Sequence, residues 1–183
     1  MLNIFDWMRG HSRSGRTATD IYGSIVAQAR DPTFYRSFGV SDVAEKRYEM
    51  IVLHIVLVLQ RLRASGEDGT QMARAVIEAF VRDLDGSMRE MAVGDTKVPA
   101  KVKKAAGGLY DRDLLYRQAF DDAEGTTLGE LLSDLILDGG KESDSAALLR
   151  YAMNARDSLR DWHLVDGPAA LRFPVPADFL ERG

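Results

Sequence analysis

The sequence predicts an all-α protein, a single-domain helical bundle built around one long buried helix. Three observations support this prediction. The segment 51–59 is apolar except for His54, apolar residues recur elsewhere at helical spacing, and Gly, Asp and Pro separate these periodic stretches without a run of alternating strand residues. With 183 residues, 45% of them hydrophobic, the chain is long enough to bury one substantial core.

The composition excludes several classes of function. The formal net charge is −4, whereas a general nucleic-acid binder needs a basic face, so no specific nucleic-acid partner is expected. The absence of cysteine excludes disulfides, thiolate nucleophiles and cysteine-ligated metals. His11, His54 and His163 lie far apart in the sequence, and we predict neither a metal site nor a cofactor. No apolar run reaches the roughly 20 residues of a transmembrane helix, so we expect an untargeted, cytoplasmic bacterial protein.

The apolar segment 51–59 is predicted to be the middle of a helix. Its β-branched residues alone would favour a strand, but Asp42 and Glu45 form a capping-box-like start, and Arg61 and Arg63 suit the negative end of a helix dipole. A helix of roughly 22 residues that is apolar on all sides must be surrounded by other helices. We therefore expect core positions at Ile51, Ile55, Val58 and Leu62.

Six further helices are predicted from periodicity and punctuation. The first covers about residues 18–30, and a short second helix begins at Pro32 and is capped by Asp31. The third covers residues 70–91, and the fourth begins at Pro99 and is bent or interrupted at Gly107 and Gly108. The last two cover residues 127–137 and 143–162. We expect residues 1–17 to be a flexible N-terminal segment and the proline-broken residues 166–183 to be an extended tail, draped over the body or disordered. Residues 18–165 then form the helical domain.

His54 is predicted to be a core histidine. Burial disfavours the charged imidazole, so we expect a neutral ring held by one hydrogen bond. A metal or haem role would need a second ligand that the sequence does not supply. The remaining alternative is a hydrogen bond between helices, to Glu49 or Arg89.

Asp83, Asp85 and Glu90 form an acidic cluster whose spacing does not match an EF-hand loop. We predict instead a charged seam that fixes the register of packed helices, with acidic partners for Arg47, Arg61 or Arg112. The predicted structural polar seam comprises Arg47, Glu49, His54, Asp83, Asp85, Arg89 and Glu90.

The stretch "KVPAKVKK" holds four lysines and no acid in a chain that is acidic overall. Lys97, Lys101 and Lys104 fall on one helical face, with Lys103 beside them. One interpretation is a solvated helix start, although cations there oppose the helix dipole. The other is an anion-facing patch for lipid headgroups, ribosomal RNA or an acidic client segment.

Three blocks, in order over about residues 20–120, resemble the ubiquinol-cytochrome c chaperone family, the assembly factors of respiratory complex III. They are "YGSIVAQARDPTFYRSFGVSDVAEKRYEMIVLHIVLVLQRL", "DLDGSMREMAVGDTKVPAKVKK" and "LYDRDLLY". The resemblance implies an all-α, non-enzymatic factor that assists biogenesis of cytochrome b, in mitochondria with a small partner protein near the translating ribosome. The expected partners are therefore cytochrome b or another complex III subunit, with an anionic membrane surface and a small partner protein as further candidates.

Two classes of function follow. A chaperone would hold its client in a groove between helices, at the cytoplasmic side of the inner membrane, and its predicted binding residues are Phe34, Tyr35, Phe38, Lys97, Lys101, Lys103, Lys104, Tyr110 and Arg112. The alternative is a helical enzyme that processes a lipid or quinone-like substrate with His54 and the pair Asp83 and Asp85. The absence of a nucleophile and of an activating partner for His54 argues against the enzyme.

Overall fold

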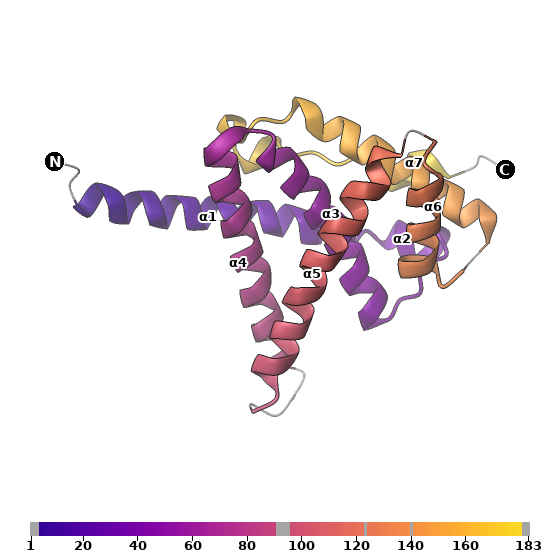
Figure 1. Ribbon diagram of the computed structural model, residues 1–183, viewed down its shortest axis with the longest axis horizontal. Coiled ribbons are helices and arrows are strands. Elements are labelled where there is room, and N and C mark those ends of the chain that lie inside the picture. The colour runs from indigo at the N-terminus through magenta and orange to yellow at the C-terminus, as the bar shows by residue number, and fades with distance from the viewer. Residues whose placement is uncertain (1–3, 91–95, 123, 140, 181–183) are drawn as a thin grey trace.

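A computed structural model describes residues 4–90, 96–122, 124–139 and 141–180, with side chains omitted for residues 4–13 and 143 (Figure 1). These residues form helices and turns, and they include no strand. The predicted all-α, single-domain bundle is therefore confirmed. No helix in the described ranges is long and apolar enough to cross a membrane.

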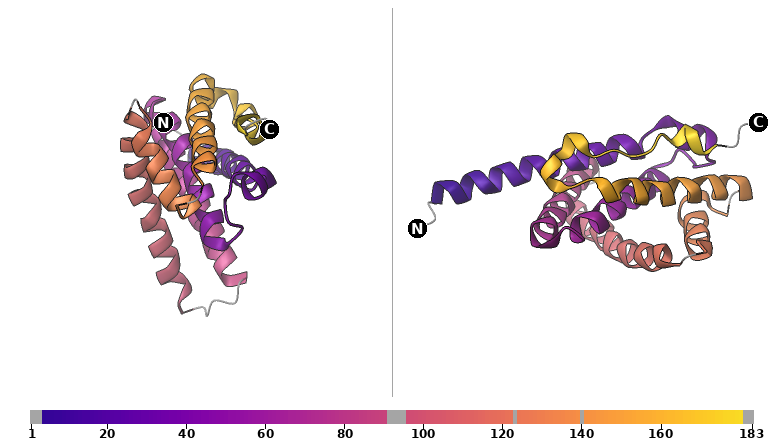
Figure 2. Two further views of the ribbon diagram at one scale, coloured as in Figure 1. Left: turned by 90° about the vertical axis from the view of Figure 1, so that its right-hand side faces the viewer. Right: turned by 90° about the horizontal axis from the view of Figure 1, so that it is seen from above.

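Seven α-helices occur in the described part of the chain: α1 (Ile4–Ala29), α2 (Pro32–Ser37), α3 (Ala44–Arg63), α4 (Gly66–Glu90), α5 (Val98–Asp121), α6 (Thr126–Leu132) and α7 (Glu142–Ser158). A π-helical turn, Ser133–Leu137, continues α6, and short 3₁₀ turns follow α7. Two helices begin earlier than predicted, α1 at residue 4 and α4 at residue 66. The predicted end of α4 at Met91 lies outside the described residues. Figures 1 and 2 show α4 and α5 as an antiparallel pair that projects from the body, and α1 as a long helix that extends from one end.

The central position of α3 confirms the interpretation of the apolar segment. The helix contacts α1, α4, α5 and the π-helical turn, and all of residues 52–59 are buried. Ile55, Val58 and Leu62 are fully buried, as predicted. Ile51 is only half-buried and packs at the edge of the core, because its neighbours do not cover that side of the helix.

The start of α3 differs from the prediction. Val43 is the N-cap and makes no side-chain capping bond, so the capping box between Asp42 and Glu45 does not form. Asp42 lies one residue before the cap, and its Oδ1 accepts a hydrogen bond from Nε of Arg47 at 2.6 Å instead. The shorter helix α2 does begin as predicted, because Oδ1 of Asp31 accepts from the backbone N–H of Thr33, the second residue of the helix, at 2.8 Å.

Helix α5 is continuous through Gly107 and Gly108, and the predicted interruption there is wrong. Leu109 and Tyr116 are both fully buried on the side that faces the body. Val102 is buried before the glycine pair as well, so burial on both sides of the pair favours a single helix and outweighs a propensity cost of about 1 kcal/mol per glycine.

The segment after α7 packs against the body. Leu171 and Pro176 are buried, and Nε2 of Gln28 on α1 donates to the carbonyl of Pro174 at 3.1 Å. A second bond, from Arg150 on α7 to the carbonyl of Phe179, is 3.0 Å long. These contacts attach the tail to α1 and α7, which is one of the two arrangements that its prolines predict.

Candidate functional site: a cleft between α3, α4 and α5

A cleft of about 800 Å³ opens where the first turns of α3 face the last turns of α4, the first half of α5 and the π-helical turn. Leu84 and Met88 line it from α4, and Leu135 lines it from the π-helical turn. Lys101 and Lys104 lie on the α5 wall. The cleft thus combines apolar side chains with two of the four predicted lysines.

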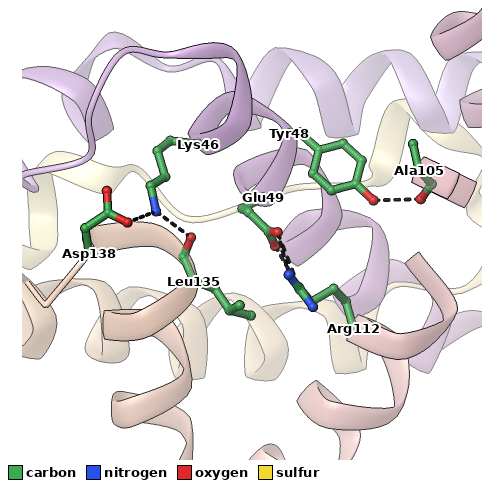
Figure 3. Close-up of polar contacts among 7 residues, drawn as sticks. All are labelled: Lys46, Tyr48, Glu49, Ala105, Arg112, Leu135 and Asp138. Atoms are coloured by element: carbon green, nitrogen blue, oxygen red, sulfur yellow. Dashed lines mark hydrogen bonds and ion pairs between the residues drawn. The ribbon is translucent and has the colours of Figure 1, made fainter. Parts of the chain in front are cut away.

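A partly buried ion pair lies at the floor of the cleft, between α3 and α5 (Figure 3). Arg112 donates to both carboxylate oxygens of Glu49, from Nη2 at 2.9 Å and from Nε at 3.1 Å. The Glu49 carboxylate raises the pKa of Arg112, so the guanidinium stays charged. Both residues were predicted, Arg112 as a client contact and Glu49 as part of a polar seam, but not as partners of each other.

Tyr48 provides the second link between α3 and α5. Its hydroxyl donates to the carbonyl of Ala105 at 2.7 Å, and burial raises the pKa of Tyr48 to about 12, so it remains a neutral donor. Gly108 makes this contact possible, because a Cβ there would lie 3.0 Å from the Tyr48 hydroxyl. Gly108, one of the two glycines at which an interruption was predicted, thus allows α3 and α5 to pack closely.

Lys46 joins α3 to the π-helical turn (Figure 3). Its Nζ donates to the carbonyl of Leu135 at 2.9 Å and pairs with the carboxylate of Asp138. Asp138 ends the turn in the left-handed conformation, with φ of 51°. A cation at the C-terminal end of a helix satisfies free carbonyls, which explains why Lys46 is buried although lysine rarely is.

The structure divides the predicted lysine patch. Lys101 and Lys104 lie on the cleft side of α5, and neither forms an ion pair with any residue in the described ranges. Lys97 and Lys103 do not line the cleft. Lys103 is seven residues before Tyr110, which places both on an edge of α5 away from the cleft, where Tyr110 is 58% exposed.

The predicted aromatic groove does not form. Phe34 and Phe38 are fully buried and stack edge-to-face with each other and with Tyr151, so they belong to the core. Tyr35 is half-buried, with its hydroxyl donating to the carbonyl of Ala29 at 2.8 Å and the guanidinium of Arg47 over its ring. An apolar pair spaced four residues apart marks one helix face, and in α2 that face points inward.

The predicted pairing of the acidic cluster with Arg47, Arg61 or Arg112 is also wrong. Asp83 accepts a hydrogen bond from the hydroxyl of Tyr22 at 2.8 Å, and Asp85 pairs with Arg89 one turn along the same helix at 2.8 Å. Glu90 is exposed at the end of α4. Arg47 forms an ion pair with Asp42, as described above, and Arg61 is hydrogen-bonded to Ser65 and His163.

A further ion pair between α3 and α5 was not predicted from the sequence. Nη1 of Arg63 donates to both carboxylate oxygens of Asp113, at 2.7 and 2.9 Å, and Asp113 is buried. A signal for this pair was present, because Asp113 lies on the same helical stripe as Leu109 and Tyr116. A charged residue within an apolar stripe indicates a buried partner.

His54 is a buried, neutral member of a hydrogen-bonded chain. Since the carbonyl of Met50 can only accept, Nδ1–H of His54 donates to it at 2.7 Å, and Nε2 then accepts from the hydroxyl of Tyr151 at 2.7 Å. Gln28 donates to the Tyr151 hydroxyl at 3.0 Å. Burial lowers the pKa of His54 to about 4. The histidine thus makes two hydrogen bonds rather than the one predicted, and its side-chain partner is Tyr151, not Glu49 or Arg89.

The residues of the alternative enzyme site do not converge. His54 has no exposed surface, while Asp83 and Asp85 are engaged on α4 as described above. None of the three lines the cleft. Within the ranges that the structure describes, no group of three or more His, Asp and Glu side chains is placed to hold a metal ion.

Comparisons with known proteins agree with this architecture. The family model described as ubiquinol-cytochrome C chaperone matches residues 36–165, a range that includes every residue lining the cleft. The crystal structure of the Cbp3 homolog from Brucella abortus is similar, with a TM-score of 0.80, 29% sequence identity, and coverage of 96% of this chain and 98% of that one. No curated protein matches the chain. The chain belongs to the ubiquinol-cytochrome c chaperone family.

Proposed function

We propose that this protein is an assembly chaperone for the ubiquinol–cytochrome c reductase complex and that it binds a segment of newly made cytochrome b in the cleft between α3, α4 and α5. Family membership supports the assembly role. One observation supports the site: the cleft pairs an apolar surface with two exposed lysines, Lys101 and Lys104, that have no ion-pair partner in the described part of the chain.

The side chains around the cleft suit an amphipathic client segment. Leu84, Met88 and Leu135 offer apolar contact, and the flexible thioether of a methionine adapts to differently shaped partners. Lys101 and Lys104, one turn apart, would attract an acidic side chain or a terminal carboxylate on the edge of that segment. Recognition of a helix in a groove by apolar anchors and flanking charge is a common mode of peptide binding.

The floor of the cleft is fixed before a client arrives. The pair Glu49–Arg112 and the bond from Tyr48 to Ala105 tie α3 to α5, and Lys46 ties α3 to the π-helical turn. A preformed surface loses less conformational entropy on binding. We infer a holding function without a catalytic step, because the charged groups at the floor are occupied by each other.

The client is proposed to be cytochrome b or another complex III subunit, and the protein is proposed to work peripherally at the membrane into which that subunit is inserted. A small partner protein would bind elsewhere on the surface. These assignments extend what membership of the family implies.

A pull-down with charge-reversed variants tests the site. The double variant Lys101→Glu/Lys104→Glu reverses the cleft lysines, and Lys97→Glu/Lys103→Glu makes the same change in charge outside the cleft. Tagged proteins are purified from detergent-solubilised membranes, and cytochrome b is quantified by mass spectrometry. We expect recovery to fall roughly tenfold or more for the cleft variant and to stay near wild type for its matched control.

All four lysines are exposed, so neither variant should change the melting temperature. Equal recovery of cytochrome b with both variants and wild type would show that the cleft lysines take no part in binding. A loss with both variants would show that overall charge, and not the cleft, determines recovery.

A further inference from the structure

Exposed apolar side chains gather on α5. Among residues whose side chains the structure describes, six large hydrophobic ones are exposed, and three of them lie within two turns of this helix. They are Tyr110 at 58%, Leu114 at 51% and Leu115 at 41%. An exposed apolar cluster on a folded protein indicates a contact surface.

The same helix carries an excess of positive charge. Its exposed basic residues are Lys97 at the N-cap, Lys101, Lys103, Lys104 and Arg117, and its exposed acidic residues are Asp111 and Asp121. No acid occurs between residues 97 and 110, although the whole chain has a net charge of −4. The surface of α5 is therefore basic within an acidic protein.

The apolar cluster and Lys103 face away from the body, whereas Lys101 and Lys104 line the cleft. Helix α5 packs on α3 and α4 through buried residues such as Val102, Leu109 and Tyr116, which lie on the opposite side of the helix. Lys103, Tyr110 and Leu114 follow one another along the outer edge, and at Gly107 between them an added Cβ would meet no atom within 4 Å. Both views in Figure 2 place α5 at the outside of the molecule.

We propose that the outward face of α5 binds the surface of an anionic lipid bilayer. Its lysines contact phosphate headgroups, and Tyr110, Leu114 and Leu115 enter the boundary between the headgroups and the acyl chains. Lysines gain attraction from an anionic surface without needing fixed partners, and tyrosine is enriched at membrane interfaces. Protein interfaces, in contrast, are depleted in lysine, so charge complementarity favours a lipid surface over a protein partner.

This inference rests on the proposed function for its biological setting, since cytochrome b is inserted into a membrane. The cleft opens beside the same helix, with Lys101 and Lys104 on its α5 wall. A chaperone held by the outer face of α5 would keep that cleft next to the bilayer surface. A client segment at the interface could then enter the cleft without crossing bulk water.

Vesicle flotation tests the surface with the full-length protein. One set of vesicles contains phosphatidylglycerol mixed with phosphatidylcholine, and the other contains phosphatidylcholine alone. We expect the wild type to float with the anionic vesicles, to float less as salt rises and to remain at the bottom with neutral ones. Two variants address the two parts of the surface: Tyr110→Ser/Leu114→Ser/Leu115→Ser and Lys97→Glu/Lys103→Glu.

Each variant should reduce the bound fraction roughly fivefold or more. The matched controls are Val165→Ser, at a residue that is 92% exposed, and Lys141→Glu, both outside α5; they should float like wild type. All substituted residues are exposed, and unchanged melting temperatures show that the fold is retained.

The proposal is overturned if the wild type does not float with anionic vesicles or if both α5 variants float as wild type does. If the α5 variants float with anionic vesicles as the wild type does but no longer co-purify with a protein that the wild type retains, the face is a protein interface instead. Recovery of cytochrome b from detergent separates the two proposals. A variant that loses vesicles but retains cytochrome b leaves the proposed function intact, whereas a wild type that binds vesicles but never cytochrome b contradicts the proposed function alone.

Discussion

At the scale of single residues, the buried polar groups of this protein differ in whether they have partners. His54, Tyr151 and Gln28 form a chain in which each donor meets an acceptor. The hydroxyl of Tyr116 is equally buried but has no hydrogen-bond partner among the residues that the structure describes. This contrast leads to two predictions about stability.

The first prediction concerns pH. Burial lowers the pKa of His54 from 6.5 to about 4, so below pH 6.5 the unfolded chain binds a proton that the folded protein does not. The free energy of unfolding should therefore fall as pH drops from about 6.5 to about 4, by roughly 3 kcal/mol from this residue. Urea unfolding of His54→Gln, whose side chain does not titrate, should show a shallower fall over this window. Equal slopes for wild type and His54→Gln would contradict the assignment.

The second prediction compares two buried tyrosines. Tyr151→Phe removes the donor to Nε2 of His54 and should lower the free energy of unfolding by about 1–3 kcal/mol, because a buried acceptor loses its partner. Tyr116→Phe removes a hydroxyl without a partner and should be neutral or slightly stabilising. Chemical denaturation of both variants measures the difference. Equal destabilisation by the two substitutions is the result that this interpretation does not allow.

At the scale of secondary structure, the sequence predicted which segments are helical better than where they begin or break. The apolar middle of α3 predicted a surrounded helix because no side of it is polar. Its start was predicted wrongly because a carboxylate near the start of a helix can accept a hydrogen bond either from the backbone or from a side chain. Asp42 accepts one from the side chain of Arg47. The break expected in α5 is absent because Gly108 accommodates Tyr48, a contact between distant segments that local propensity does not describe.

The glycine pair in α5 gives a third prediction. Gly107 lies where an added methyl group meets open space, so Gly107→Ala should raise the free energy of unfolding by about 0.5–1 kcal/mol through helix propensity. Gly108→Ala has the same propensity gain, but its methyl group would press on the Tyr48 hydroxyl, so the gain should be reduced or reversed. Thermal melts of the two variants measure the difference. Identical stabilisation would show that the contact between α3 and α5 is loose.

The fourth prediction concerns the burial of α3. Val58→Asp places a carboxylate in a fully buried position without a partner and should unfold the protein or render it insoluble. Val165→Asp makes the same chemical change at a residue that is 92% exposed and should leave the melting temperature unchanged. Circular dichroism melts of both proteins provide the measurement. A Val58→Asp protein as stable as wild type is incompatible with a buried central helix.

At the scale of the whole molecule, the site was predicted only in part. The lysines and Arg112 were identified because charge and motif stand out in a linear sequence. Which helices meet was not predictable, because periodicity defines the faces of a helix but not its neighbours. The cleft joins segments 44–49, 84–88, 101–112 and 134–135, and the pairing of Glu49 with Arg112 follows only from that packing. The prediction of an aromatic groove was wrong for the same reason, because apolar residues have the same spacing on a helix face that points into the core and on one that is exposed.

The arrangement of helices gives the two proposed surfaces different tasks. The cleft side of α5 presents Lys101 and Lys104 above an apolar wall, and the outer edge presents Lys103, Tyr110 and Leu114 to the surroundings. One helix would thus separate a client site from a membrane surface. The lysines that look like a single patch in the sequence are expected to act as two independent groups.

The central claim is that the client lies in the cleft, and photo-crosslinking from inside it is the most direct test. A photoreactive amino acid replaces Met88, which lines the cleft from α4, or Arg82, which is exposed on the same helix and does not line it. After irradiation of cells that are making complex III, we expect an adduct that contains cytochrome b or another complex III subunit from position 88 and none from position 82. Adducts from position 82 but not from position 88, or equal adducts from both, would contradict the assignment of the cleft as the client site.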